Sequence, residues 1–238
     1  MKEKIVSWLK DQVNAAGAKG IVMGLSGGID SCVAAVLAKQ AVGADRLLCL
    51  ILPCQSAAGD TREAKMFARR FGIKAKTIDL SNPYNSLIKI LPPAGSLARS
   101  NLKPRLRMLA LYYFANKYNY LVCGTGNKSE LKAGYFTKFG DGGADILPIA
   151  GLLKKDVIKL ARQLRIPENI ILKPPTAGLY PGQTDEGEMG ITYAALDDIL
   201  ERMEQGRRQT APKAQLKKVK QMMLRSEHKR QGPKICCL

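Results

Sequence analysis

The sequence has few of the side chains that usually carry acid–base or metal chemistry. Histidine occurs once, as His228, so a Ser–His–Asp hydrolase would depend on that single residue. The six cysteines form no Cys-x-x-Cys pair, and most lie in apolar runs, which is typical of small buried side chains in a reducing compartment. These absences argue against a zinc site, a disulfide framework and a triad hydrolase.

Long apolar segments are also missing. The first twenty residues mix charged side chains with Ile5, Trp8, Leu9 and Val13 at helical spacing, unlike the continuous apolar core of a signal peptide. No stretch approaches the roughly 18 apolar residues that a membrane-spanning helix requires. The length of 238 residues suits one large core. We therefore expect a single catalytic domain over residues 1–238, located in the cytoplasm and without a membrane partner.

Acidic side chains are scarce relative to basic ones. The chain has 38 Lys and Arg against 20 Asp and Glu, which gives a formal net charge of +18. Such an excess indicates an anionic partner: a nucleic acid, a membrane surface or a phosphorylated small molecule. Part of the excess lies in residues 202–234, and a basic run of this kind is often only a solvated face. Aromatic residues make up 6% and are not interleaved with basic ones, so a nucleic-acid binder would have little stacking platform.

The sequence does contain an alternation of short apolar runs and helical patterns. Strands are expected at 19–26, 46–53, 74–80, 120–126 and 144–150, and helices at 29–42, 60–71, 100–118 and 153–164. This alternation predicts an α/β fold, a doubly wound, Rossmann-like parallel sheet with helices on both faces and ligands at the carboxyl ends of its strands. A Pro- and Gly-rich loop is expected at 166–191, and helices follow at 192–205 and 212–225.

The first expected strand runs through LSGGIDS, residues 25–31, directly into a helix. Ser26, Gly27 and Gly28 let the backbone approach an anion closely, and the helix N-terminus adds free N–H groups. Asp30 can bind Mg²⁺ through a carboxylate oxygen, and Ser31 can donate to a phosphate. A plain glycine turn with capping side chains would share part of this pattern. The complete SGGxDS string resembles the fingerprint of the pyrophosphate-loop (adenine nucleotide alpha hydrolase-like) enzymes, which split ATP between its α and β phosphates.

A second group of motifs narrows the resemblance. Residues 124–157 read GTGNKSELKAGYFTKFGDGGADILPIAGLLKKDV, and KPPTAGLYPGQTDEGEMGITYAALDDIL (173–200) and SEHKRQGP (226–233) follow. In this order, and together with the ATP loop, they cover nearly the whole chain and resemble the NAD synthetase family in its NH3-dependent form. The resemblance implies an ATP-dependent amidation of deamido-NAD with ammonia, through an acyl-adenylate, giving NAD, AMP and pyrophosphate.

The resemblance also implies roles for individual residues. Asp30, Asp141 and Lys154 would be catalytic, and Asp30 and Glu130 would bind Mg²⁺. Contacts with ATP would come from Gly24, Leu25, Ser26, Gly27, Gly28, Ile29, Asp30, Ser31, Thr125, Lys154 and Thr176. Deamido-NAD would be bound by Arg105, Lys138, Asp145, His228 and Lys229, with Tyr135 and Phe136 near the nicotinate or its ribose. Pro104 stands where many members have Ala, so Arg107 is the alternative to Arg105.

Further expectations concern partners and alternatives. The resemblance implies a homodimer that binds the dinucleotide across its interface, through the first helix or the helix at 100–118, and no nucleic-acid partner. The short segment before the ATP loop leaves no room for the glutaminase domain of longer members, so free ammonia or a separate partner is expected to supply nitrogen. Segments 174–190 and 139–143 would close over the ligands. The alternatives are a tRNA-modifying pyrophosphate-loop ATPase and a nonenzymatic nucleic-acid-binding protein.

Overall fold

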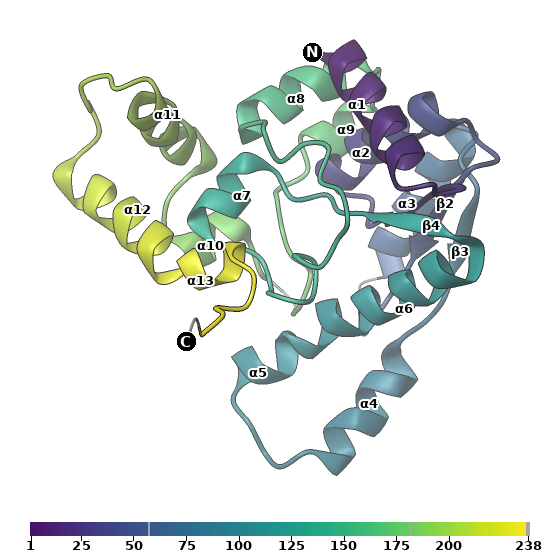
Figure 1. Cartoon of the computed structure of the whole chain (residues 1–238). Coiled ribbons are helices and arrows are strands. Elements are labelled where there is room, and N and C mark those ends of the chain that lie inside the picture. Colours follow the sequence, from purple (N-terminus) through teal and green to yellow (C-terminus); the bar gives the residue numbers. More distant parts are fainter. Residues whose placement is uncertain (57, 181, 237–238) are drawn as a thin grey trace.

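The computed structural model describes residues 1–56, 58–180 and 182–236. Its strands form one sheet (Figure 1). The strands are β1 (Gly20–Gly24), β2 (Leu47–Ile51), β3 (Ala75–Thr77) and β4 (Tyr120–Cys123), in the order β3-β2-β1-β4 and all parallel. The chain adds β2 and β3 on one side of β1 and then returns to place β4 on the other side. Between β1 and β4 the strand order therefore reverses, which is where open α/β sheets bind ligands.

Helices cover both faces of the sheet, as the alternation predicted. One face shares a core with α1 (Lys2–Ala15), α2 (Ile29–Val42), α3 (Ala58–Arg70), α8 (Lys154–Gln163) and α9 (Glu168–Ile171). The other face is covered by α4 (Ser81–Ile90) and α6 (Leu102–Tyr118), and the short α5 (Ser96–Ser100) precedes α6. Because both faces are covered, β1 and β2 are almost entirely buried, which explains their continuous apolar sequences.

A third group of helices surrounds its own apolar cluster. It consists of α7 (Lys128–Ala133), α10 (Asp185–Met189), α11 (Tyr193–Glu204), α12 (Lys213–Arg225) and α13 (Glu227–Arg230). The cluster joins buried residues of four of these helices, among them Ala133, Met189, Leu196 and Val219. Figure 1 shows α11, α12 and α13 on the opposite side of the molecule from β2 and β3. Within the described part of the chain, every helix is too short or too polar to cross a bilayer.

Two local expectations were wrong. Residues 144–150 form no strand: Ile146 makes one isolated parallel bridge with Cys123, and Gly124 donates to the Ile146 carbonyl at 2.9 Å. The ladder stops there because Pro148 has no N–H to donate. The expected loop 166–191 contains the short helices α9 and α10. Pro181, which was counted in that loop, lies outside the described residues.

Candidate active site

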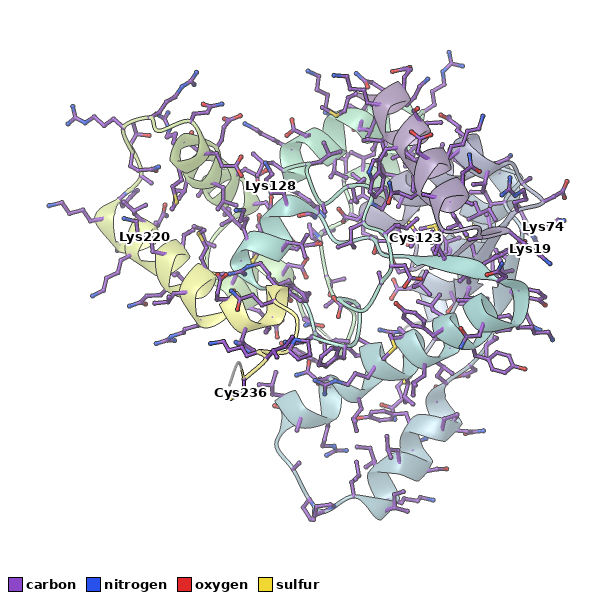
Figure 2. All side chains as sticks on the ribbon, viewed as in Figure 1. Lys19, Lys74, Cys123, Lys128, Lys220 and Cys236 are labelled. Carbon is purple, nitrogen blue, oxygen red and sulfur yellow. The ribbon has the colours of Figure 1, made fainter. Side chains whose placement is uncertain are left out.

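A cavity of about 840 Å³ opens at the carboxyl edge of the sheet. Gly24 of β1, Ile51 of β2 and Cys123 of β4 line it, together with residues from the loops that follow these strands. Cys123 is labelled in Figure 2 near the centre of the molecule, at the end of β4. The cavity therefore lies at the switch point of the sheet, where the sequence placed the chemistry.

The loop between β1 and α2 is held by its two serines. Ser31 Oγ donates to the Gly28 carbonyl at 2.8 Å and accepts from the Ser26 N–H at 3.3 Å, while Ser26 Oγ accepts from the Gly28 N–H at 3.2 Å. Gly27 has φ +85°, and an added Cβ would lie 3.3 Å from backbone atoms of α3. The loop is thus fixed before any ligand arrives, with the N-terminus of α2 facing the cavity.

A buried ion pair joins α2 to α8. Lys154 Nζ lies 2.5 Å from Asp30 Oδ2, and the Lys154 side chain is only 4% exposed. The Asn127 amide donates to the other Asp30 oxygen at 2.9 Å, and the Lys154 ammonium lies over the Tyr193 ring at 5.0 Å from its centroid. Burial disfavours the charged lysine, but the Asp30 and Glu130 carboxylates outweigh burial and raise the pKa of Lys154.

Two further carboxyl groups line the same end of the cavity. Glu130 belongs to a capping box of α7: its carboxylate accepts from the Asn127 N–H at 3.1 Å, and its own N–H donates to Asn127 Oδ1 at 3.0 Å. Burial and the nearby Asp30 carboxylate raise the pKa of Glu130. Asp185 accepts from the Tyr193 hydroxyl at 3.0 Å, whereas its Oδ1 has no hydrogen-bond partner among the described residues. This end of the cavity is acidic.

Other residues of the cavity lining carry cationic groups. Arg107 lines it and donates to the Leu52 carbonyl at 3.1 Å. Lys229 Nζ donates to the carbonyls of Gly134 and Phe136, each at 2.9 Å. Asp141 lies among them and accepts from the Thr137 N–H at 2.9 Å. These residues add positive charge to the cavity lining.

The segment 173–180 forms another wall of the cavity and is fastened at both ends. Lys173 Nζ lies 2.7 Å from Asp60 and 2.5 Å from Glu63, both on α3. Lys103 of α6 donates to the Leu179 carbonyl at 2.7 Å. Tyr180 donates to Glu188 of α10. These bonds hold the segment in the cavity wall, and its Lys173 end shares α3 with Gly27 of the loop after β1.

Most of the residues predicted for the site line this one cavity. They are Gly24, Leu25, Ser26, Gly28, Ile29, Asp30, Ser31, Thr125, Glu130, Asp141, Lys154, Thr176 and Lys229, together with Tyr135 and Phe136. Gly27 is absent from the lining but forms the turn of the loop. The structure does not test their roles, which stay predictions.

The other substrate residues lie outside the cavity lining. Arg105 and His228 are exposed, and Lys138 links them: it accepts from Arg105 through its carbonyl at 3.4 Å and donates to the His228 carbonyl at 2.5 Å. Asp145 uses one oxygen to accept from the Val122 N–H at 2.7 Å and the other from a tyrosine hydroxyl. Arg107, the alternative to Arg105, is the arginine of this pair that faces the cavity.

The comparisons with known proteins agree with this geometry. The family model described as NAD synthase matches residues 1–233. The chain is 46% identical to an NH(3)-dependent NAD(+) synthetase from Carboxydothermus hydrogenoformans over 98% of this chain and 95% of that one. The chain belongs to the NAD synthase family. It is accordingly a ligase of NAD biosynthesis, in a family that uses ATP.

Solved structures give the same NAD synthase fold. An NMN synthetase from Francisella tularensis is similar with a TM-score of 0.92 and 39% identity, over 100% of this chain and 97% of that chain. An NH3-dependent NAD synthetase from Campylobacter jejuni is similar with a TM-score of 0.86 and 28% identity, over 99% and 96%. Neither alternative function, tRNA modification or nonenzymatic nucleic-acid binding, is favoured by these comparisons.

Three residues at the site of this NAD synthase family member were not assigned a role from the sequence, or only as a substitute. Asp185 and Arg107 line the cavity, and Asn127 is buried behind its wall, where it donates to Asp30. Asn127 was visible only as a loop residue, although its spacing of three from Glu130 is the signature of a capping box. Asp185 lies in the Pro- and Gly-rich stretch and shows no local pattern. Their positions at the site result from tertiary contacts.

Proposed function

We propose that this chain adenylates the carboxylate of deamido-NAD with ATP and then amidates it with ammonia. The observation that carries the proposal is the loop of residues 24–31, which faces the same cavity as the buried Asp30–Lys154 pair. The carboxylate oxygen attacks the α-phosphorus of ATP and pyrophosphate leaves. Ammonia then attacks the acyl carbon, AMP leaves, and one proton is released. NAD, AMP and pyrophosphate are formed in equal amounts.

The residues at the acidic end would bind and orient the phosphates. Backbone N–H groups at the start of α2 and the Ser26 and Ser31 hydroxyls face the position of the leaving pyrophosphate. Lys154 would exchange its bond with Asp30 for one with a phosphate oxygen, which places a positive charge where negative charge develops. Thr125 and Thr176 would donate hydroxyl hydrogen bonds to ATP.

The donor set at this end fits Mg²⁺ if phosphate completes it. The described residues contain no group of three or more His, Cys, Asp or Glu side chains arranged to bind a metal ion. Mg²⁺ commonly takes one or two carboxylates and fills its other positions with phosphate oxygens and water. Asp30 and Glu130 supply two carboxylates at the cavity wall. Bound there, Mg²⁺ would neutralise the charge of the departing pyrophosphate.

The cationic residues of the cavity lining would bind the pyridine nucleotide. Lys229 and Arg107 lie near Asp141, so they provide positive charge for the nucleotide phosphates while Asp141 faces the incoming ammonia. Asp141 is our candidate for accepting the proton that ammonia releases. The segment 173–180 would exclude water from the acyl-adenylate, whose hydrolysis would waste ATP. Free ammonia is the proposed nitrogen source, in keeping with the NH3-dependent synthetases that the chain resembles.

A homodimer in the cytoplasm is the proposed working form. On α6, the side chains of Leu109 and Tyr113 are one helical turn apart and are 60% and 63% exposed. Large apolar side chains exposed next to each other are typical of a protein interface. Arg105 lies on the same helix and is exposed as well. A dinucleotide bound at an interface on this face would therefore be within reach of Arg105.

One observation favours a second candidate substrate. The similarity to the NMN synthetase of Francisella tularensis, with a TM-score of 0.92, is higher than that to the NAD synthetase of Campylobacter jejuni. Amidation of nicotinate mononucleotide would use the same adenylation chemistry on a shorter substrate. The nicotinate carboxylate and one phosphate are common to both acids.

The test is an assay with ATP, Mg²⁺ and ammonium, in which either deamido-NAD or nicotinate mononucleotide is the only acid. We expect AMP and the amide in equal amounts, with a larger kcat/KM for deamido-NAD, and an Asp30→Ala variant at least about a hundredfold slower. A larger kcat/KM for the mononucleotide would establish the second candidate. ATP cleavage only in the presence of tRNA or another carboxylic acid would contradict both.

A further inference from the structure

The N-terminus of α8 has no capping side chain of its own. Leu153 stands at the N-cap, where Ser, Thr, Asp or Asn would satisfy the first N–H groups. Instead, the Lys154 N–H donates to Ser129 Oγ of α7 at 3.0 Å, and the Lys155 N–H donates to Asp197 Oδ2 of α11 at 2.8 Å. The cap of this helix is therefore supplied from two other helices.

Asp197 and Ser129 are themselves joined and buried. Ser129 Oγ donates to the other oxygen of Asp197. Asp197 is 2% exposed and Ser129 is 0% exposed. No described Lys or Arg side chain forms an ion pair with Asp197. A buried carboxylate is costly, and here its charge is balanced by hydrogen bonds, by the dipole of α8 and by the nearby Lys155 ammonium.

The contacts of Asp197 converge on the two side chains that face ATP. Lys154, whose N–H the pair caps, is the residue that reaches Asp30, and Ser129 is the immediate neighbour of Glu130. Helix α11 also contacts the ammonium end of Lys154, through the ring of Tyr193. At the C-terminal end of α11, Glu204 pairs with Lys128 of α7 at 2.8 Å. Lys128 is labelled in Figure 2. Helix α11 thus fixes α7 and α8 relative to each other.

We propose that Asp197 is a positioning residue for phosphate binding. Its carboxylate, acting through Ser129 and the first N–H groups of α8, holds Lys154 where its ammonium meets the phosphates of ATP. This inference rests on the proposed role of Lys154. Asp197 touches neither substrate, and its effect reaches the reaction only through the position of α8.

Asp197→Asn is the first variant. It keeps the size of the side chain but replaces one of the two accepting oxygens with an NH2 group, which cannot accept a hydrogen bond. Its crystal structure should show Lys154 Nζ moved away from Asp30. Its affinity for ATP, measured by calorimetry in EDTA so that no metal contributes, should fall about tenfold. Asp198→Asn is the matched control: it is the next residue on α11, lies at the surface in a pair with Arg202, and should bind ATP like the wild type.

A double-mutant cycle separates positioning from general destabilisation. In a Lys154→Ala background, Asp197→Asn should weaken ATP binding by less than about twofold, because the residue it positions is gone. If Asp197→Asn folds poorly, Ser129→Ala replaces it, because it removes only one hydroxyl. Its effect on ATP binding should likewise shrink in the Lys154→Ala background. The proposal would be overturned if the two substitutions weakened ATP binding independently, so that their fold-changes multiplied in the double variant. It would also be overturned if Lys154 stayed on Asp30 in the structure of Asp197→Asn. If Lys154→Ala alone binds ATP normally, the proposed role of Lys154 fails, and the variant structure still decides the positioning.

Discussion

Asn127 uses its side chain for two purposes. The oxygen caps α7, and the amide donates to Asp30 at 2.9 Å. Asn127→Ser would retain a capping oxygen but lose the amide donor. We expect the free energy of unfolding to change by less than about 0.5 kcal/mol, whereas kcat/KM should fall by about tenfold or more because Asp30 loses its orientation. Thermal unfolding and the steady-state assay measure the two effects.

Asn127→Ala is the matched variant for that experiment. It removes the cap as well as the donor, so it should lose about 1 kcal/mol of stability in addition and be no more active than Asn127→Ser. Full activity in the serine variant would show that the amide does not orient Asp30.

The two glycines of the loop between β1 and α2 should respond differently to alanine. Gly27 has φ +85° and a Cβ there would press on the backbone of α3, whereas Gly28 has φ −76° and its Cβ would meet only a serine hydroxyl. Gly27→Ala should therefore lower the free energy of unfolding by about 1–2 kcal/mol, and Gly28→Ala by much less. Chemical denaturation of both variants makes the comparison, and equal losses would contradict it.

At the scale of elements, the segment 173–180 depends on one lysine for its contact with α3. Lys173→Ala removes two partly exposed ion pairs, together worth about 1 kcal/mol. Since the segment would then leave the cavity wall more readily, KM for ATP should rise about fivefold while the melting temperature changes little. Arg162→Ala, which breaks an exposed pair between α8 and α9, is the control and should leave KM unchanged. An unchanged KM in Lys173→Ala would show that the pairs do not hold the segment.

The sequence predicted long elements well and short ones poorly. The bounds of α2 matched the expected 29–42 because Gly28 and Gly43 bracket an unbroken apolar helix. The strand expected at 144–150 does not form. An apolar pattern does not show whether the backbone can continue pairing with a neighbouring strand, and here Pro148 has no N–H to do so. Helix α10 was missed because five residues are too few for a periodic pattern, although Thr184 caps it.

The candidate site divides in the same way. Residues 25–31 could be assigned because they are contiguous and their chemistry needs no distant partner. Arg107 could be named only as the alternative to Arg105, and Asp185 not at all, since only the folded chain places them at the cavity. The net charge of +18 indicated an anionic partner but did not locate its site: Lys213, Lys217 and Lys220 lie on α12, outside the cavity, and Lys220 is labelled on that helix in Figure 2.

At the scale of the whole molecule, the exposed face of α6 predicts the assembly state. Leu109→Asp combined with Tyr113→Asp should convert a dimer into a monomer, because two carboxylates cannot be desolvated in an apolar interface. Analytical ultracentrifugation measures the mass, and the activity with deamido-NAD should fall in parallel. Leu224→Asp is the control, since Leu224 is 77% exposed on α12. A wild-type protein that sediments as a monomer would contradict the prediction.

Because α13 contributes Lys229 to the cavity wall, the cavity is completed only late in the synthesis of the chain. Asp30 leaves the ribosome well before Lys229, which bonds to the carbonyls of Gly134 and Phe136 and follows every other residue of the cavity lining in the chain. A growing chain can fold the loop after β1 and the sheet before α13 exists. It acquires a complete cavity only after Lys229 has emerged. A chain whose translation stops before Lys229 therefore lacks the part of the cavity wall that α13 contributes.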